Sequence, residues 1–240
     1  MDRAELITEL IKYNEGDPKR SQHLIKVHSL AAVIGRGEGL KSEEMEILET
    51  AAITHDIGIR LSEKKYGNCC GSNQEKEGPG EAEKLLKRLG YPQKVTDRVC
   101  WLIGHHHTYD NIVEQDHRIL VEADFLVNLY EDGAGRKEIE SAYDRIFRTE
   151  TGRTLCRAMF GLDENERPDS DKADYSQAKV RQGYVVTEKC VQCRSCVDVC
   201  PMQCIDGSRK PVYINQEKCL HCGTCAGVCD HKAIIAVNKC

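Results

Sequence analysis

The sequence lacks any long apolar run. Nowhere in its 240 residues do 18 consecutive apolar residues occur, so no helix is expected to span a membrane. The first ten residues, MDRAELITEL, are charged from position 2 and have no apolar signal core, so we expect no secretory signal peptide.

Aromatic and basic residues are also scarce. Aromatics make up 5% of the chain, and 34 Lys and Arg are outnumbered by 39 Asp and Glu, which gives a formal net charge of −5. Nucleic-acid surfaces combine basic patches with stacking aromatics, and no long basic run is present. We therefore expect neither a nucleic-acid partner nor a membrane partner.

Cysteine, by contrast, is abundant, with 14 residues that mostly fall at CxxC spacing. In a secreted chain they would suggest disulfides. Without a signal peptide, this spacing favours metal clusters in a reducing compartment. The expected location is cytoplasmic.

Hydrophobic periodicity predicts an all-helical domain over residues 1–160. In the second helix, which begins at Pro18, His23 lies on the same apolar stripe as Val27 and Leu30. Residues 60–78 are polar and are predicted to form a long loop. The expected helices cover residues 3–13, 18–34, 42–56, 79–89, 93–106, 117–130, 135–148 and 153–160.

The last third of the sequence differs from the rest in composition and in hydrophobic pattern. Residues 161–183 are charged, contain a proline and have little apolar periodicity, which is typical of a linker. From Tyr184 onward, short β-type runs alternate with cysteine clusters. This pattern predicts a small α+β domain over residues 184–240.

Residues 51–59, AAITHDIGI, place His55 and Asp56 side by side at the end of an apolar helix. Adjacent helical side chains point about 100° apart, so both bind one ion only if neighbouring helices supply further ligands. The other candidates are His23, one histidine of the GHHH run at 104–107, and Asp124. These imidazole and carboxylate groups suit iron, manganese, zinc, nickel or cobalt.

The order H…HD…H…D resembles the HD-domain superfamily of metal-dependent phosphohydrolases over about residues 18–150. HLIKVHSLA at 23–31 is similar to the family's first histidine helix, and VEADFLVNL at 121–129 to its final-aspartate helix. The resemblance implies an all-α HD-domain bundle with one or two divalent ions. Its implied ligands are His23, His55, Asp56, His106 and Asp124.

Many two-metal members of the superfamily carry two more histidines between the HD pair and the final aspartate. The family spacing selects His106 when counted from Ile103, and His105 when counted from Leu102; we favour His106. At the other position, KEGPGEAEKLL has Glu77 before a glycine, where the family often has histidine. Either Glu77 substitutes as an oxygen ligand, or the second metal site is incomplete.

The chemistry implied by the resemblance is hydrolysis of a phosphate ester, often on a nucleotide. A metal-bound water would be the nucleophile, and Asp56, Glu77 and His106 are the candidates to accept its proton. Weaker candidates for binding the small phosphate substrate are Arg60, Lys64, Lys65, His105 and His107.

Two matched runs, at residues 189–201 and 218–230, share the spacing C-x2-C-x2-C-x3-C. They resemble the bacterial two-cluster ferredoxin, with Asp230 in place of the second run's final proline. In that family, the fourth cysteine of each run serves the other cluster. The resemblance implies one 4Fe–4S cluster on Cys190, Cys193, Cys196 and Cys229, and a second on Cys219, Cys222, Cys225 and Cys200.

Three functions follow. The leading one is an HD-type phosphohydrolase whose ferredoxin domain serves redox sensing or electron transfer. The alternative is a di-iron oxygenase or oxidoreductase supplied with electrons by the clusters, although Glu77 in place of a histidine weighs against it. The third is a non-enzymatic electron-transfer adaptor, which the nearly complete ligand set disfavours. A redox partner protein would exchange electrons with the clusters.

Overall fold

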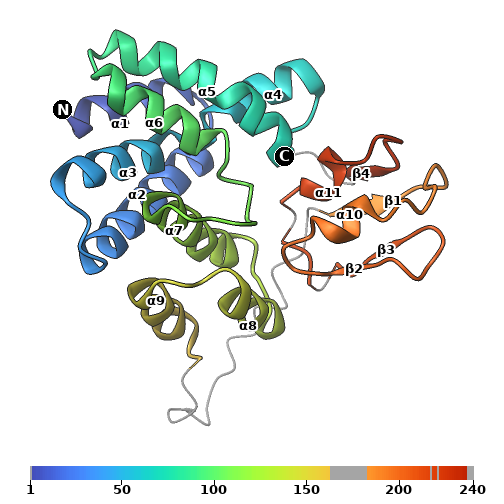
Figure 1. Ribbon diagram of the computed structural model, residues 1–240. Coiled ribbons are helices and arrows are strands. Elements are labelled where there is room, and N and C mark those ends of the chain that lie inside the picture. Colours follow the sequence, from blue (N-terminus) through green and yellow to red (C-terminus); the bar gives the residue numbers. More distant parts are fainter. Residues whose placement is uncertain (1, 163–182, 217, 221, 237–240) are drawn as a thin grey trace.

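The computed structural model describes residues 2–162, 183–216, 218–220 and 222–236. Residues 2–162 form a helical domain, and residues 183–236 form a smaller cysteine-rich module beside it (Figure 1). The helices of the first part are α1 (Arg3–Tyr13), α2 (Pro18–Gly37), α3 (Ser42–Thr54), the 3-10 turn η1 (His55–Gly58), α4 (Ile59–Tyr66), α5 (Gly71–Arg88), α6 (Gln93–Ile103), α7 (Gln115–Glu131), α8 (Arg136–Arg145) and α9 (Glu150–Phe160).

The core of the helical domain lies where α2 packs against α3 and α7. Val27, Leu48 and Leu120 are fully buried there, and each such side chain contributes about 1.5–3 kcal/mol through burial. Helix α2 begins at Pro18, and the Asp17 carboxylate accepts a hydrogen bond from the Arg20 N–H at 2.9 Å. This start places His23 in the second turn, on the buried face.

The prediction of a long loop over residues 60–78 was wrong. Helix α4 occupies residues 59–66, and α5 begins at Gly71 and not near Pro79. Gly67 ends α4 in the left-handed conformation, at φ +70°. Pro79 lies inside α5, and the buried residues before it are Gly71, Gln74 and Gly78, none of which has a large apolar side chain. With so little apolar surface, the first half of α5 gave no periodic signal.

The cysteine-rich module contains two antiparallel two-stranded sheets. Strand β1 (Tyr184–Val186) pairs with β4 (Ile234–Ala236), and β2 (Ile205–Asp206) pairs with β3 (Tyr213–Ile214). Two single-turn helices, α10 (Ser195–Asp198) and α11 (Thr224–Gly227), each carry the third cysteine of a run. The predicted fold class, an all-α domain followed by a small α+β domain, is confirmed.

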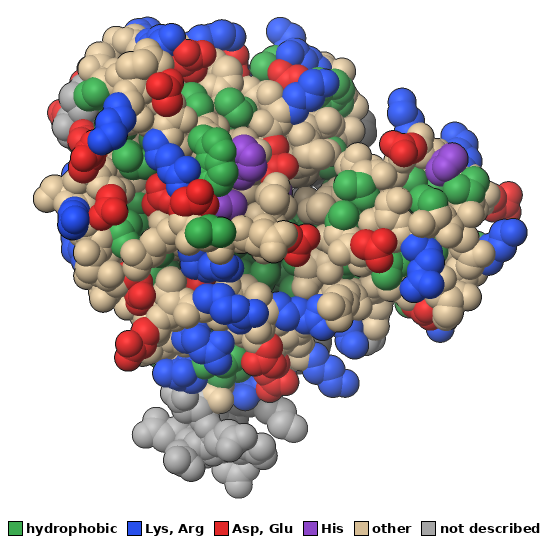
Figure 2. Space-filling view, viewed as in Figure 1, with side chains coloured by type: hydrophobic (Ala, Val, Ile, Leu, Met, Phe, Trp, Pro, Cys, Tyr) green, Lys and Arg blue, Asp and Glu red, His purple; other side chains and the backbone are tan. Residues whose placement is uncertain are grey.

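The two parts of the molecule touch where α11 contacts α5. In the space-filling view the module projects to one side of the helical domain, with a hollow between them (Figure 2). Helix α9 ends at Phe160, and most of the predicted linker, residues 161–183, lies outside the described residues. Among the residues described, no helix is long and apolar enough to cross a membrane.

Candidate metal centre

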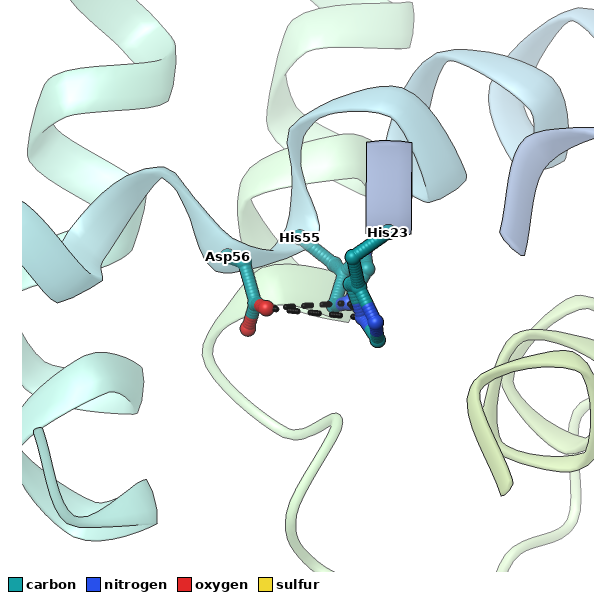
Figure 3. Close-up of side chains that lie close together, drawn as sticks. All are labelled: His23, His55 and Asp56. Atoms are coloured by element: carbon teal, nitrogen blue, oxygen red, sulfur yellow. Dashed lines mark hydrogen bonds and ion pairs between the residues drawn. The ribbon is translucent and has the colours of Figure 1, made fainter. Parts of the chain in front are cut away.

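Three segments bring histidine and carboxylate groups together at one point. His23 comes from α2, His55 and Asp56 from η1, and Asp124 from α7. The His23 Nε2 lies 3.3 Å from the His55 Nε2 and 3.2 Å from an Asp124 oxygen. Figure 3 shows His23, His55 and Asp56 pointing toward one another. These four predicted ligands therefore form one group.

Asp56 links this group to a second one. Its Oδ2 lies 3.6 Å from the Nε2 atoms of both His23 and His55, whereas its Oδ1 lies 3.6 Å from the His106 Nε2. His107 completes the second group, because Asp56, His106 and His107 each offer a ligand atom within 4.8 Å of the others. The two oxygens of one carboxylate thus face two different sets of histidines, an arrangement suited to one or two ions.

The Nδ1 atoms of the histidines fix which ring nitrogen faces the centre. The His55 Nδ1–H donates to the Ala52 carbonyl at 3.0 Å, and the His106 Nδ1–H donates to the Ile103 carbonyl at 2.7 Å. The His23 Nδ1 is 3.2 Å from a Glu131 oxygen. Partners of this kind hold metal-binding histidines in the tautomer whose Nε2 lone pair is free.

One buried atom supports a metal ion at this centre. The His106 Nε2 is buried and has no hydrogen-bond partner among the described residues, and only 1% of His106 is exposed. Buried polar atoms are rarely left unsatisfied. An ion coordinated by this nitrogen and Asp56 would satisfy it, and the mixture of imidazole and carboxylate matches common divalent-metal sites.

The electrostatics of the centre agree with this interpretation. Burial by itself lowers the pKa of His23, but the carboxylates of Asp124 and Glu131 outweigh it and raise that pKa to about 10. Burial and the neighbouring His106 lower the pKa of His107 to about 3. Despite burial, the histidines hold the pKa values of Asp56 and Asp124 below their ordinary range. The two carboxylates are therefore ionised and able to bind a cation, and His23 carries a proton that a bound cation would have to displace.

A cavity of about 240 Å³ opens beside these groups. Its described wall contains two cationic side chains, Lys19 and Arg20, both at the start of α2. The cysteine-rich module supplies Tyr184, Leu220 and Cys222 to the same wall. The cavity is therefore lined by residues of both parts of the chain, with the metal-binding side chains and the cations coming from the helical domain.

The cysteines of the module line two separate cavities. Cys190, Cys193, Cys196 and Cys229 line one of them, which we call the distal cysteine site. Cys200, Cys219, Cys222 and Cys225 line the other, the proximal cysteine site, together with Cys204. In each, the fourth cysteine comes from the other run, so the structure groups them in the two interleaved sets that the ferredoxin resemblance implied.

Comparison with known families agrees with the geometry. The HD domain family matches residues 20–142, slightly more than half of the chain. The chain belongs to the HD-domain family. A second family, the 4Fe–4S dicluster domain, matches residues 177–233, so the fusion predicted from sequence is confirmed. No curated protein and no solved structure matches the chain.

HD domains are a superfamily of metal-dependent hydrolases, and the second match supports 4Fe–4S cluster binding. Of the histidines between the HD pair and Asp124, His106 faces the centre, as preferred from sequence. His105 does not, because its ring stacks on Trp101 at 4.2 Å between centroids. His28, also on α2, lies with its Nε2 3.2 Å from a Glu49 oxygen.

The structure does not bring Glu77 to the HD centre. Its carboxylate accepts hydrogen bonds from Lys65 at 2.5 Å and Tyr66 at 2.6 Å. The side chain on α5 that faces the centre is Gln74, whose Oε1 lies 3.2 Å from the His107 Nε2. Gln74 lies three residues before Glu77 on α5. Because this segment was predicted to be a loop, Gln74 was not recognised as part of a helix.

The three cations proposed from sequence also lie elsewhere. The Arg60 guanidinium donates to the Tyr13 carbonyl, Lys65 is paired with Glu77, and neither they nor Lys64 line the cavity. Lys19 and Arg20 occupy that position instead. Sequence analysis did not single out either residue. Both lie at the start of the His23 helix, four and three residues before His23, and that spacing was the available signal.

Proposed function

We propose that this protein is a phosphohydrolase that acts on a small phosphate ester at the HD centre. The observation that carries the proposal is the sharing of Asp56 between two histidine groups beside a cavity with cations at its edge. His23, His55, Asp56 and Asp124 would hold one ion, and Asp56, His106 and His107 would hold a second. Bound there, the ions would supply an acidified water and polarise the phosphate.

The chain's own residues account for the remaining requirements. Lys19 and Arg20 supply positive charge at the edge of the cavity, where phosphate oxygens would be bound. Arg20 is held by Glu63 at 3.0 Å and Asp17 at 3.3 Å, which orients its guanidinium. Asp56, with one oxygen toward each histidine group, would hold both ions, and its lowered pKa keeps it ionised for that role.

We also propose that the module carries two 4Fe–4S clusters, one in each cysteine site. Support comes from the two separate cavities, each lined by four cysteines in the interleaved order. Iron and acid-labile sulfide counts of about eight each per chain, beyond any iron at the HD centre, are expected for protein purified without oxygen.

The function is tested by phosphate release from nucleotides and small phosphate esters. Each assay contains one divalent metal: manganese, zinc, iron, nickel or cobalt. We expect hydrolysis with at least one ester, and a loss of at least about 100-fold in Asp56→Asn. Asp97→Asn is the matched control, because Asp97 is exposed on α6 and bonded only to Gln93 in the hydrogen bonds described. No phosphate release from any ester would contradict the proposal.

A di-iron oxidoreductase is the second candidate. It is favoured by one observation, that Cys222 of the proximal cysteine site lines the HD cavity. Iron-loaded protein examined by EPR during stepwise reduction discriminates the two functions. A mixed-valence signal from the HD centre, in protein that releases no phosphate, would replace the hydrolase with this candidate.

A further inference from the structure

The HD cavity and the proximal cysteine site share a wall. Cys222 lines both of them, and Leu220, two residues earlier, does the same. No residue of the helical domain lines the distal cysteine site within the described part of the chain. A change of charge in the proximal site would therefore reach the HD cavity more strongly than the same change in the distal site.

The contact between the two parts is close at this wall. The Gly71 N–H at the start of α5 donates to the Cys222 carbonyl at 3.3 Å. A Cβ on Gly223 would lie 2.9 Å from the Cys70 Cβ, and one on Gly227 would lie 2.2 Å from the Ser72 hydroxyl. Because Gly223 and Gly227 have no side chain, the module can lie directly against the N-terminus of α5.

The same terminus reaches the metal centre on its other side. A Cβ on Gly71 would lie 2.7 Å from the His107 ring. One residue therefore touches the proximal cysteine loop through its N–H and lies against a histidine of the HD centre. Protein rather than bulk water lies between the two sites at this contact. Protein screens charge less than water does, so charges at the two sites interact more strongly than they would across solvent.

We propose that the oxidation state of the cluster in the proximal cysteine site controls the affinity of the HD cavity for its anionic substrate. The proposal rests on the proposed function, because it takes the substrate to be a phosphate ester. An external one-electron donor converts the cluster from the 2+ to the 1+ state, which adds one negative charge to the wall. No electron passes to the HD centre, and the bound phosphate is repelled.

The linkage is reciprocal and has a defined sign. A reduced cluster weakens phosphate binding, so bound phosphate must make the cluster harder to reduce by the same factor. A phosphate group carries about 1.5 to 2 negative charges at pH 7. We expect about a tenfold change in the dissociation constant, within the usual range for coupled sites. For a one-electron couple, this equals a fall of about 59 mV in midpoint potential.

The experiment uses the full chain, purified without oxygen and carrying diamagnetic Zn²⁺ at the HD centre, with inorganic phosphate as the probe. Calorimetry gives the phosphate dissociation constant for oxidised and for electrochemically reduced protein. EPR-monitored potentiometry gives both cluster midpoints with and without phosphate. We expect weaker phosphate binding after reduction and a negative shift of one midpoint, with the other midpoint moving clearly less.

A permanent charge placed in the shared wall reproduces the effect without any redox change. Leu220→Glu should weaken phosphate binding by oxidised protein about tenfold, as reduction does. Val191→Glu adds the same charge to a loop at the distal site, where Val191 is 56% exposed, and should leave phosphate binding unchanged. If Leu220→Glu does not fold, the measurements on the unaltered chain decide the question.

Equal phosphate affinities in the two oxidation states, with neither midpoint moved, would overturn the inference. So would the absence of phosphate binding in both states. Ester hydrolysis that is unaffected by reduction would leave the proposed function standing and remove only the redox control. Redox-dependent phosphate binding without hydrolysis of any ester would support the redox control and contradict the proposed function.

Discussion

Single residues decide the chemistry of the HD centre through their hydrogen bonds. His55 and His106 each donate Nδ1–H to a carbonyl three residues earlier, so each directs Nε2 toward the carboxylates. His105, next to His106, donates its Nδ1–H to the Trp101 carbonyl at 2.7 Å and stacks on the indole. Neighbouring histidines on one turn therefore have different roles.

This difference predicts opposite results for two adjacent substitutions. His106→Gln removes the buried, unpartnered Nε2, and the ion shared with Asp56 should bind at least about 100-fold more weakly. His105→Gln removes only the contact with Trp101, and should cost about 0.5–1.5 kcal/mol of stability while leaving metal content unchanged. Elemental analysis after dialysis checks both variants. Equal metal loss in the two would contradict the assignment of His106.

Metal binding should become tighter as the pH rises. The carboxylates around His23 raise its pKa from the ordinary 6.5 to about 10 against the effect of burial. Protonated His23 therefore stabilises the metal-free fold, fully so below pH 6.5. This contribution to stability is lost as the pH rises through about 10. An ion must displace that proton, so its apparent affinity should rise about tenfold per unit between pH 7 and 9. Competition with a chromogenic chelator, corrected for the chelator's own protonation, measures it. A flat affinity would contradict the prediction.

At the scale of elements, the close approach of α5 to η1 holds the HD pair in place. A Cβ on Gly58, the last residue of η1, would lie 2.7 Å from both the Gln74 carbonyl oxygen and the Gly78 nitrogen. These are backbone atoms of α5, so they cannot move aside separately. Two facing glycines thus let α5 cross directly over the turn that carries His55 and Asp56.

Gly58→Ala should destabilise the protein by about 1–3 kcal/mol, because the added methyl group forces two helices apart. Gly80→Ala on α5, the helix that Gly58 contacts, is the matched control. Nothing lies within 4 Å of its added Cβ, and the change should stabilise the helix by about 0.5–1 kcal/mol. Denaturant unfolding without oxygen measures both. Equal effects of the two substitutions would show that the contact is unimportant.

Elements with a continuous apolar stripe were predictable from sequence, and α5 was not. Helix α1 covers the expected residues 3–13, and α6 begins at the expected Gln93. In α5, the first turns bury Gln74 and Gly78, neither of which contributes an apolar signal. Their burial depends on η1 and α6 packing against them, a contact that no local pattern records.

For the whole molecule, the main consequence is that one cavity needs both parts of the chain. The helical domain supplies the HD centre and the cations, whereas Tyr184, Leu220 and Cys222 belong to the cysteine-rich module. A substrate in this cavity would contact residues 200 positions apart in the sequence, such as Arg20 and Leu220. In the proposed function, substrate selection would therefore depend on both parts of the chain.

Leu220→Ala should raise the KM for a phosphate ester about 3- to 10-fold with little change in kcat. It removes apolar wall surface worth about 0.8 kcal/mol per buried methylene but touches no metal-binding residue. Val191→Ala, at the distal cysteine site, should leave both constants unchanged. Steady-state kinetics on the two variants test this. A fall in kcat alone for Leu220→Ala would contradict a role in substrate binding.

The helical class, the HD motif and the ferredoxin-type cysteine runs could all be predicted without the structure. Each of these depends on spacing within a short segment, and such spacing is legible without knowledge of the rest of the fold. The tertiary structure decided that Gln74 and not Glu77 faces the centre, that Lys19 and Arg20 border the cavity, and that Cys222 lines it. Those facts depend on which surfaces pack together, and packing is set by contacts between residues far apart in the chain.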